Sequence, residues 1–339
     1  MAVLEVDELR MHFRTRHGVV HAVDGVSFAV GRGETLGIVG ESGSGKTMTA
    51  LSVVGLIPRP TAQIVGGSIR FEGRDLTNLR ERELEEIRGR DIGMIFQDPM
   101  TSLNPTVTIG GQIEEVLRRH LRLSRAAVRK RAVELLEEVR MPRAAQKIHE
   151  YPHRFSGGMR QRVMIAVAIA CNPKLLIADE PTTALDVTIQ AEILDLLDEL
   201  RRAHEMAMIL ITHDMGVVAQ VAHEVLVMYA GQIVERAEAI ELFEHPEHPY
   251  TTALLDALPP LEGAEVRHAR LRTIPGTPPD LVDPAPVCRF APRCPYAGHD
   301  DCATTAPRLR EIRPGHFVRS AHPASERRYF EAGVSMGEP

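Results

Sequence analysis

Hydrophobic and polar positions change their spacing several times along this chain, and each spacing predicts an element. Apolar and polar residues alternate over residues 20–30 and again over 68–71, which indicates half-exposed antiparallel strands. Residues 35–39 instead form a short apolar run, as expected of a buried strand. The first part of the chain therefore predicts an antiparallel unit that flanks one buried strand.

A helical pattern replaces this alternation between residues 106 and 154. Ser124 is a favourable N-cap for a helix whose apolar positions recur at spacings of four, three and four, on one side of the helix. These positions are Val128, Ala132, Leu135 and Val139. We expect a helical subdomain at about residues 99–155.

Strand-like runs return in the second half of the chain. They cover residues 174–178, 207–211 and 225–229, and a helical pattern over 187–204 separates the first two. Strands that alternate with helices predict an α/β fold with a mainly parallel core sheet.

Proline marks the main boundary. Thirteen of the 23 prolines lie between Pro259 and Pro339, where long periodic apolar segments also end. At 339 residues the chain suits one large domain and a smaller appendage. We predict a domain over residues 1–257 and a C-terminal extension over 258–339.

Directly after the buried strand, the chain carries a complete G-x-x-x-x-G-K-T phosphate loop. Backbone N–H groups of such a loop and the start of the next helix face phosphate, the lysine reaches the terminal phosphates, and the threonine hydroxyl binds Mg²⁺. The expected contacts with ATP are Gly40, Glu41, Ser42, Gly43, Ser44, Gly45, Lys46, Thr47 and Met48.

Two further patterns carry chemistry. The apolar run at 174–178 ends in Asp179 and Glu180, at the edge where an α/β sheet presents groups to a ligand. Asp179 suits Mg²⁺, with Thr47, and Glu180 suits the polarisation of an attacking water. Ser156, Gly157 and Gly158 precede an apolar helix and predict a second anion-binding edge at its positive end.

In this order the motifs resemble those of ABC ATPases. The sequence Ser-Gly-Gly-Met-Arg-Gln, 110 positions after Lys46, is similar to the family's signature motif, and residues 184–186 are similar to its D-loop. The resemblance implies that Gln97 is the Q-loop glutamine, which senses Mg²⁺ and the attacking water, and that His213 is the switch histidine at the γ-phosphate. It also places the adenine-stacking residue at His17.

Longer stretches resemble the ATP-binding subunits of dipeptide, oligopeptide and nickel importers, most closely the D-type subunits of the peptide permeases. These stretches are residues 96–105, 178–190 and 248–255. The resemblance implies an ABC-type P-loop ATPase with an antiparallel β subdomain, a helical subdomain and a small proline- and cysteine-containing extension. It implies ATP hydrolysis that powers peptide uptake, or nickel or other small-solute uptake as the alternative. A soluble non-transport ABC ATPase and a P-loop small-molecule kinase are less compatible with the motifs.

The implied partners are two transmembrane permease subunits, a second ATPase subunit that is either a copy or a related chain, and, through the permease, an extracytoplasmic binding protein. Two ATPase subunits would face head to tail, so that the Lys46 loop of one and the Ser156 edge of the other enclose ATP. The N-terminus has no signal-peptide pattern, and the longest apolar run, 163–171, is too short to span a bilayer. We expect a peripheral protein on the cytoplasmic side of the membrane, and the net charge of −6 gives no case for nucleic-acid binding.

Three cysteines of the extension, Cys288, Cys294 and Cys302, resemble part of the family's four-cysteine iron–sulfur ligand set. The fourth position is Ser320, and His322 is the other nearby ligand candidate. The sequence leaves two interpretations open: a cluster or a zinc ion held by these residues, or thiols that bind no metal.

Overall fold

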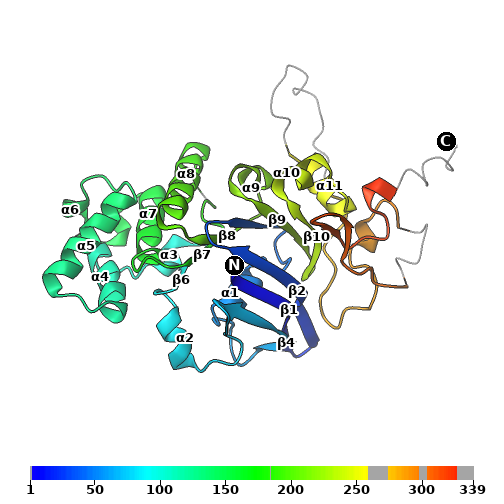
Figure 1. Ribbon diagram of the computed structural model, residues 1–339, viewed down its shortest axis with the longest axis horizontal. Coiled ribbons are helices and arrows are strands. Elements are labelled where there is room, and N and C mark those ends of the chain that lie inside the picture. Colours follow the sequence, from blue (N-terminus) through cyan, green and yellow to red (C-terminus); the bar gives the residue numbers. More distant parts are fainter. Residues whose placement is uncertain (1, 184, 259–273, 298–303, 327–339) are drawn as a thin grey trace, which may run out of the picture.

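The computed structural model describes residues 2–183, 185–258, 274–297 and 304–326 (Figure 1). A helical group lies at one end of the molecule, two sheets lie in the middle, and the C-terminal extension lies at the other end (Figure 1). Within the described residues, no helix is long and apolar enough to cross a membrane.

The larger sheet has eight strands in the order β11-β12-β10-β9-β3-β8-β7-β6. Five of them, from β9 to β6, run parallel, which confirms the predicted α/β fold with a mainly parallel core. The strands are β3 (Thr35–Val39), β6 (Ile92–Ile95), β7 (Leu175–Asp179), β8 (Ala207–Thr212), β9 (Glu224–Tyr229), β10 (Gln232–Glu238), β11 (Arg310–Arg313) and β12 (His316–Val318). All residues of β3 and β7 are buried, because helices or the second sheet cover both faces.

The smaller sheet is antiparallel, with the order β2-β1-β4-β5. Its strands are β1 (Ala2–Thr15), β2 (Gly18–Gly31), β4 (Ala62–Phe71) and β5 (Arg74–Asp75). The alternating patterns correctly predicted β2 and the end of β4, but they missed β1. Register shifts around Glu8, whose φ is +46°, break the alternation in β1 and hide it from a two-residue period.

Helix α1 (Lys46–Val53) lies between the two sheets, where Ala50 and Val53 join a core formed by both. Helix α2 (Glu81–Ile87) joins the same core through Leu84 and Ile87. The helical group contains α3 (Pro99–Ser102), α4 (Ile109–His120), α5 (Arg125–Glu138), α6 (Ala144–Lys147), α7 (Gly157–Ala168) and α8 (Val187–His204). Ser124 caps α5 by accepting the Ala127 N–H, and the predicted apolar stripe of α5 is fully buried. This stripe forms one core with α4, α7, α8 and strands β7 and β8.

A third core lies under α9 (Met215–Val221), α10 (Ala239–Glu244) and α11 (Pro249–Asp256). Phe290 of the C-terminal extension packs into it. The same extension continues the larger sheet, because β12 pairs antiparallel with β10 and β11 pairs antiparallel with β12. The extension therefore shares both a core and a sheet with the preceding elements, whereas the domain boundary proposed near residue 258 stays a prediction.

Candidate nucleotide site

The phosphate loop lies between the carboxyl end of β3 and the start of α1. Gly40 and Gly45 have φ values of +149° and +101°, which L side chains rarely adopt. A Cβ atom would also lie 2.2 Å from the Met228 oxygen at Gly40 and 2.4 Å from the Ala22 oxygen at Gly45. Glycine is therefore required at both ends of the loop.

Lys46 folds back over this loop. Its ammonium group donates to the carbonyl oxygens of Gly40 at 2.6 Å and Glu41 at 2.9 Å. The side chain is almost completely buried, and burial lowers the pKa of Lys46. The positive charge is thus held against the loop by two carbonyl oxygens, which phosphate oxygens can replace as hydrogen-bond acceptors.

Asp179 ends β7 beside the loop, and its Oδ1 accepts the Thr47 hydroxyl at 3.2 Å. The carboxylate is only 2% exposed, and burial raises the pKa of Asp179 to about 6. A buried carboxylate that accepts a hydrogen bond from a hydroxyl is a donor set that suits a hard cation such as Mg²⁺.

Three side chains contact the Glu180 carboxylate, two of them from other segments and one from the same loop. Its carboxylate accepts from Gln97 Nε2 at 2.9 Å and from the Thr183 hydroxyl at 2.8 Å, and it lies 3.4 Å from His213 Nδ1. Burial alone would raise the pKa of Glu180, but the hydrogen bonds from Thr183 and His213 outweigh it and leave the pKa lowered. Glu180 also has a φ of +47°, a left-handed conformation that is costly for this residue type.

A cavity of about 530 Å³ joins the loop to these groups. Its lining residues are Gly40, Glu41, Ser42, Gln97, Glu180, His213 and Leu254. The structure therefore brings together, at the carboxyl ends of β3, β7 and β8, residues that the sequence placed in separate motifs.

The Ser-Gly-Gly edge lies elsewhere. Ser156 caps α7, where its hydroxyl accepts the Met159 N–H at 3.4 Å, and its side chain is exposed. Gly158 lies against α8, since a Cβ there would approach Ile189 Cγ2 to 2.7 Å. None of Ser156, Gly157 and Gly158 lines the cavity above the phosphate loop.

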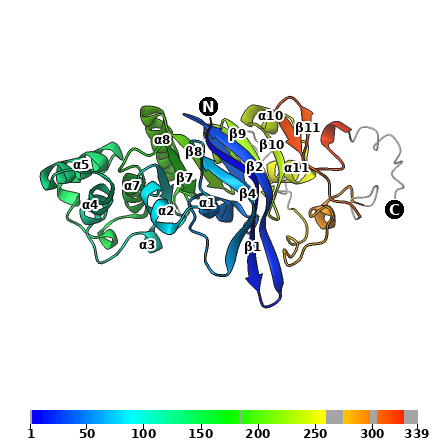
Figure 2. The same cartoon turned by 60° about the horizontal axis from the view of Figure 1, so that its bottom comes forward.

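His17 is also separate from this cavity. It is exposed in the turn between β1 and β2, where its N–H donates to the Thr15 hydroxyl at 3.2 Å. In Figure 2 this turn is the tip of a hairpin that projects from the body of the molecule. The assignment of His17 to adenine stacking stays a prediction.

Three contacts of the site carried no recognised sequence signal. Thr183 donates to Glu180, the Tyr250 hydroxyl accepts the Glu41 N–H at 2.8 Å, and Arg293 binds the Glu41 carboxylate. Thr183 lies three positions after Glu180, so a search of the sequence for hydroxyl residues near the two acids would find it. Tyr250 and Arg293 lie 209 and 252 positions from Glu41, and no local pattern links residues so far apart.

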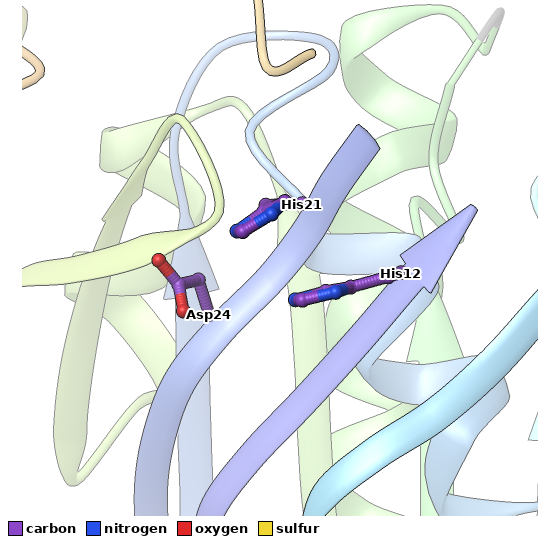
Figure 3. A group of neighbouring side chains, drawn as sticks. All are labelled: His12, His21 and Asp24. Carbon is purple, nitrogen blue, oxygen red and sulfur yellow. The ribbon is translucent and has the colours of Figure 1, made fainter. Parts of the chain in front are cut away.

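One other group of metal-ligating residues occurs in the described chain: His12, His21 and Asp24 (Figure 3). The two imidazole rings are stacked, with centroids 3.9 Å apart and planes 19° from parallel, so their in-plane lone pairs do not converge on one point. Arg289 and Gln232 both donate to Asp24 Oδ2, at 2.5 and 3.2 Å. This carboxylate is already neutralised by a guanidinium, so we assign no metal to the group although His12 Nε2 is buried without a partner.

Of the three extension cysteines, Cys302 lies outside the described residues. Cys288 and Cys294 are half-buried, and burial raises the pKa of the Cys288 thiol, which disfavours the thiolate that binds metals. Ser320 and His322 are buried, and the Ser320 hydroxyl accepts the His322 N–H at 2.9 Å. The described residues therefore do not complete a cluster or zinc site.

A phosphate loop after a central parallel strand, with an acid pair at the carboxyl end of β7, which is separated from β3 by β8, defines a P-loop ATPase fold. Comparisons with known families agree: the ABC transporter family model matches residues 23–183, and the model of the oligopeptide/dipeptide transporter C-terminal region matches residues 234–302. The chain belongs to the oligopeptide/dipeptide branch of the ABC transporter ATP-binding proteins.

The relatives include the oligopeptide transport ATP-binding protein OppD of Bacillus subtilis, which is 53% identical over 94% of this chain and 88% of that protein. The dipeptide transport ATP-binding protein DppD of Escherichia coli is 48% identical over 96% of this chain and 98% of that protein. Among solved structures, the dimeric bacterial ABC transporter cassette MJ0796 has a TM-score of 0.63 at 27% identity, covering 70% of this chain and 98% of that chain. The cassette cbiO1 of Clostridium perfringens has a TM-score of 0.61 at 28% identity, over 72% of this chain and 91% of its own.

Proposed function

We propose that this chain is the ATP-hydrolysing subunit of a peptide importer. The observation that carries the proposal is the convergence of Lys46, Asp179, Glu180 and His213 at one edge of the sheet, in a chain whose relatives are named for oligopeptide and dipeptide transport. The match of the C-terminal extension to the peptide transporter family model supports peptides over nickel or another small solute.

In this proposal the loop from Gly40 to Thr47, extended to Met48, holds the phosphates of ATP through backbone N–H groups and Lys46. Thr47 and Asp179, with Gln97 nearby, would hold the Mg²⁺ that accompanies ATP. The ion would supply charge neutralisation on the phosphate oxygens. The raised pKa and the nearly complete burial of Asp179 support this role, because such a carboxylate gains from a cation.

Glu180 orients and polarises the attacking water as general base. Its lowered pKa keeps the carboxylate ionised at neutral pH, and the bonds from Gln97, Thr183 and His213 fix its position. His213 would contact the γ-phosphate, since it lines the same cavity and points its Nδ1 toward Glu180. Adenine stacking by His17 remains part of the proposal to be tested.

The Ser156-Gly157-Gly158 edge acts on the nucleotide of a second ATPase subunit. Ser156 is exposed, none of the three residues lines the cavity of its own chain, and a related cassette forms dimers. The second subunit is a copy of this chain or a related one, and both would sit on two permease subunits at the cytoplasmic face of the membrane. A binding protein outside the membrane would deliver peptide to the permease. No role is assigned to a metal or cluster at Cys288, Cys294 and Cys302.

The test uses the complex purified with its permease and binding protein in proteoliposomes. We expect ATP-dependent uptake of a labelled peptide, and we expect Lys46→Ala to abolish uptake because it weakens ATP binding by on the order of 10²-fold. Uptake of nickel but not of peptide would replace the proposed substrate. ATP affinity that is unchanged by Lys46→Ala would remove Lys46 from the phosphate site.

A further inference from the structure

An arginine of the C-terminal extension reaches into the phosphate loop. Arg293 Nη1 and Nη2 donate to the two carboxylate oxygens of Glu41, at 2.7 and 3.0 Å. Only 4% of the Arg293 side chain and 26% of the Glu41 side chain are exposed. The paired, planar geometry and the burial make this the kind of ion pair that fixes two segments relative to each other.

Other contacts, besides the ion pair with Glu41, also hold Arg293 in place. Its Nε donates to the Pro275 carbonyl at 2.9 Å, Nη1 lies 3.4 Å from the Tyr229 hydroxyl, and the guanidinium lies 5.7 Å from the centre of the Tyr229 ring. Arg293 also lines a separate cavity of about 540 Å³ between α11 and the extension. The guanidinium therefore lies between that cavity and the phosphate loop.

The backbone N–H, the backbone carbonyl and the carboxylate of Glu41 each have a hydrogen-bond partner. Its N–H donates to Tyr250, its carbonyl accepts from Lys46, and its carboxylate is bound by Arg293. Tyr250 packs against Tyr229 and Phe290, so α11, β9 and the extension meet at this one loop residue. The conformation of the loop thus depends on the extension as well as on its glycines.

The charge of Glu41 matters as much as its position. Glu41 lines the cavity above the phosphate loop, where an unpaired carboxylate would repel the phosphates of ATP. Arg293 cancels that charge from behind the loop, at a place where it does not block the cavity.

We propose that Arg293 is a positioning residue for ATP binding, through which the C-terminal extension sets the affinity of the phosphate loop. This inference rests on the proposed function, since it needs ATP at the Lys46 loop. It assigns to the extension a role in nucleotide binding that neither family similarity nor local sequence indicated.

The test measures the binding of a fluorescent ATP analogue to the purified full-length chain, and KM and kcat for ATP in the assembled complex. We expect Arg293→Gln to weaken binding and raise KM on the order of tenfold, with kcat changed less than about twofold. Arg293→Lys keeps the charge but loses the paired geometry, so it should cost about threefold and provides a second variant if Arg293→Gln folds poorly.

Charge rescue separates this role from a merely structural one. Glu41→Gln removes the carboxylate that Arg293 neutralises, so adding it to Arg293→Gln should recover most of the lost affinity. The matched control is Arg313→Gln, which removes another extension arginine that binds carboxylates of the cassette, Glu241 and Glu247, away from the phosphate loop. This control should leave ATP affinity unchanged.

The inference is overturned if Arg293→Gln leaves the affinity unchanged, if Arg313→Gln lowers it equally, or if Glu41→Gln gives no rescue. These failures are distinguishable from failure of the proposed function. A wild-type chain that binds no ATP, or binds it independently of Lys46, would refute the proposed function itself.

Discussion

The two predicted anion-binding edges differ in how much of a site one chain supplies. At the phosphate loop, Lys46 is buried, Thr47 and Asp179 are hydrogen-bonded, and Glu180 is fixed by three side chains. At the other edge, Ser156 is exposed and its hydroxyl caps its own helix. One edge is preorganised within the chain, and the other consists of a helix start beside an exposed serine, where backbone N–H groups carry the positive end of the helix dipole.

In the proposed dimer, this difference would make closure depend on ATP. The phosphate loop would bind nucleotide within one chain, whereas the Ser156 edge would gain a partner only when another subunit presents a phosphate to it. The free energy of that contact would exist in the closed state only, so ATP would shift the equilibrium toward closure, and loss of the γ-phosphate would remove the contact.

The largest expected effect comes from Glu180→Gln. Loss of the general base should slow ATP hydrolysis by on the order of 10²-fold or more, while ATP affinity stays within about threefold, since the amide keeps the shape of the side chain. Single-turnover hydrolysis and analogue binding by the purified complex measure the two quantities. Undiminished turnover would show that Glu180 is not the base.

Gly157→Asp tests the opposite edge. A carboxylate at the start of α7 is compatible with the helix dipole but repels a phosphate, so hydrolysis by the complex should fall on the order of tenfold or more. Binding of ATP to the isolated chain should be unchanged. Gly157→Asn, of nearly the same shape without the charge, is the control, and an equal loss with Asn would indicate a steric cause instead.

The sequence predicted the phosphate-loop edge well because its parts are local. The strand at 35–39, the loop glycines and the acids after β7 each follow from short-range patterns, and the parallel sheet then brings their ends together. The cap at Ser156 is local for the same reason.

Contacts between distant segments could not be predicted in this way. Arg293 sits in a proline-rich stretch whose pattern does not indicate a partner 252 positions earlier, and β12 has too few residues to show a period. The extension is held against the earlier elements by tertiary contacts such as the packing of Phe290 and the pairing of β12 with β10. Bulges hid β1 by breaking its alternation.

A third prediction concerns the free energy that burial of the Asp179 carboxylate beside the phosphate loop costs the folded state. Asp179 is buried with a pKa raised to about 6, so its ionised form destabilises the nucleotide-free fold. Asp179→Asn should therefore raise the free energy of unfolding at pH 7.5 by about 3 kcal/mol, while it abolishes Mg²⁺-dependent hydrolysis. Urea unfolding measures the change.

The direction of this effect on the free energy of unfolding follows from its pH dependence. Between the unfolded pKa of 3.8 and the folded value of about 6, the native state binds the proton more tightly, so the destabilisation is absent below pH 3.8 and complete above pH 6. The difference in unfolding free energy between wild type and Asp179→Asn should grow across this window. Asp195 is exposed, so Asp195→Asn provides a control in which the same substitution removes a carboxylate that is not buried. A constant difference would mean that burial of charge is not its cause.

The smallest expected effect concerns the two roles of Ser156, which caps its own helix and is proposed to face the nucleotide of a second subunit. Ser156→Ala removes the acceptor for the Met159 N–H and should cost about 1 kcal/mol of stability, as for other N-caps. Ser156→Asp restores an acceptor at the same place, so it should recover the stability but not the hydrolysis, because its charge faces the phosphate of the second subunit. Calorimetry of the isolated chain and ATPase assays of the complex separate the two roles. If the aspartate variant hydrolyses ATP like wild type, the Ser156 edge does not face the phosphate, and the contrast between the two edges would be one of exposure alone.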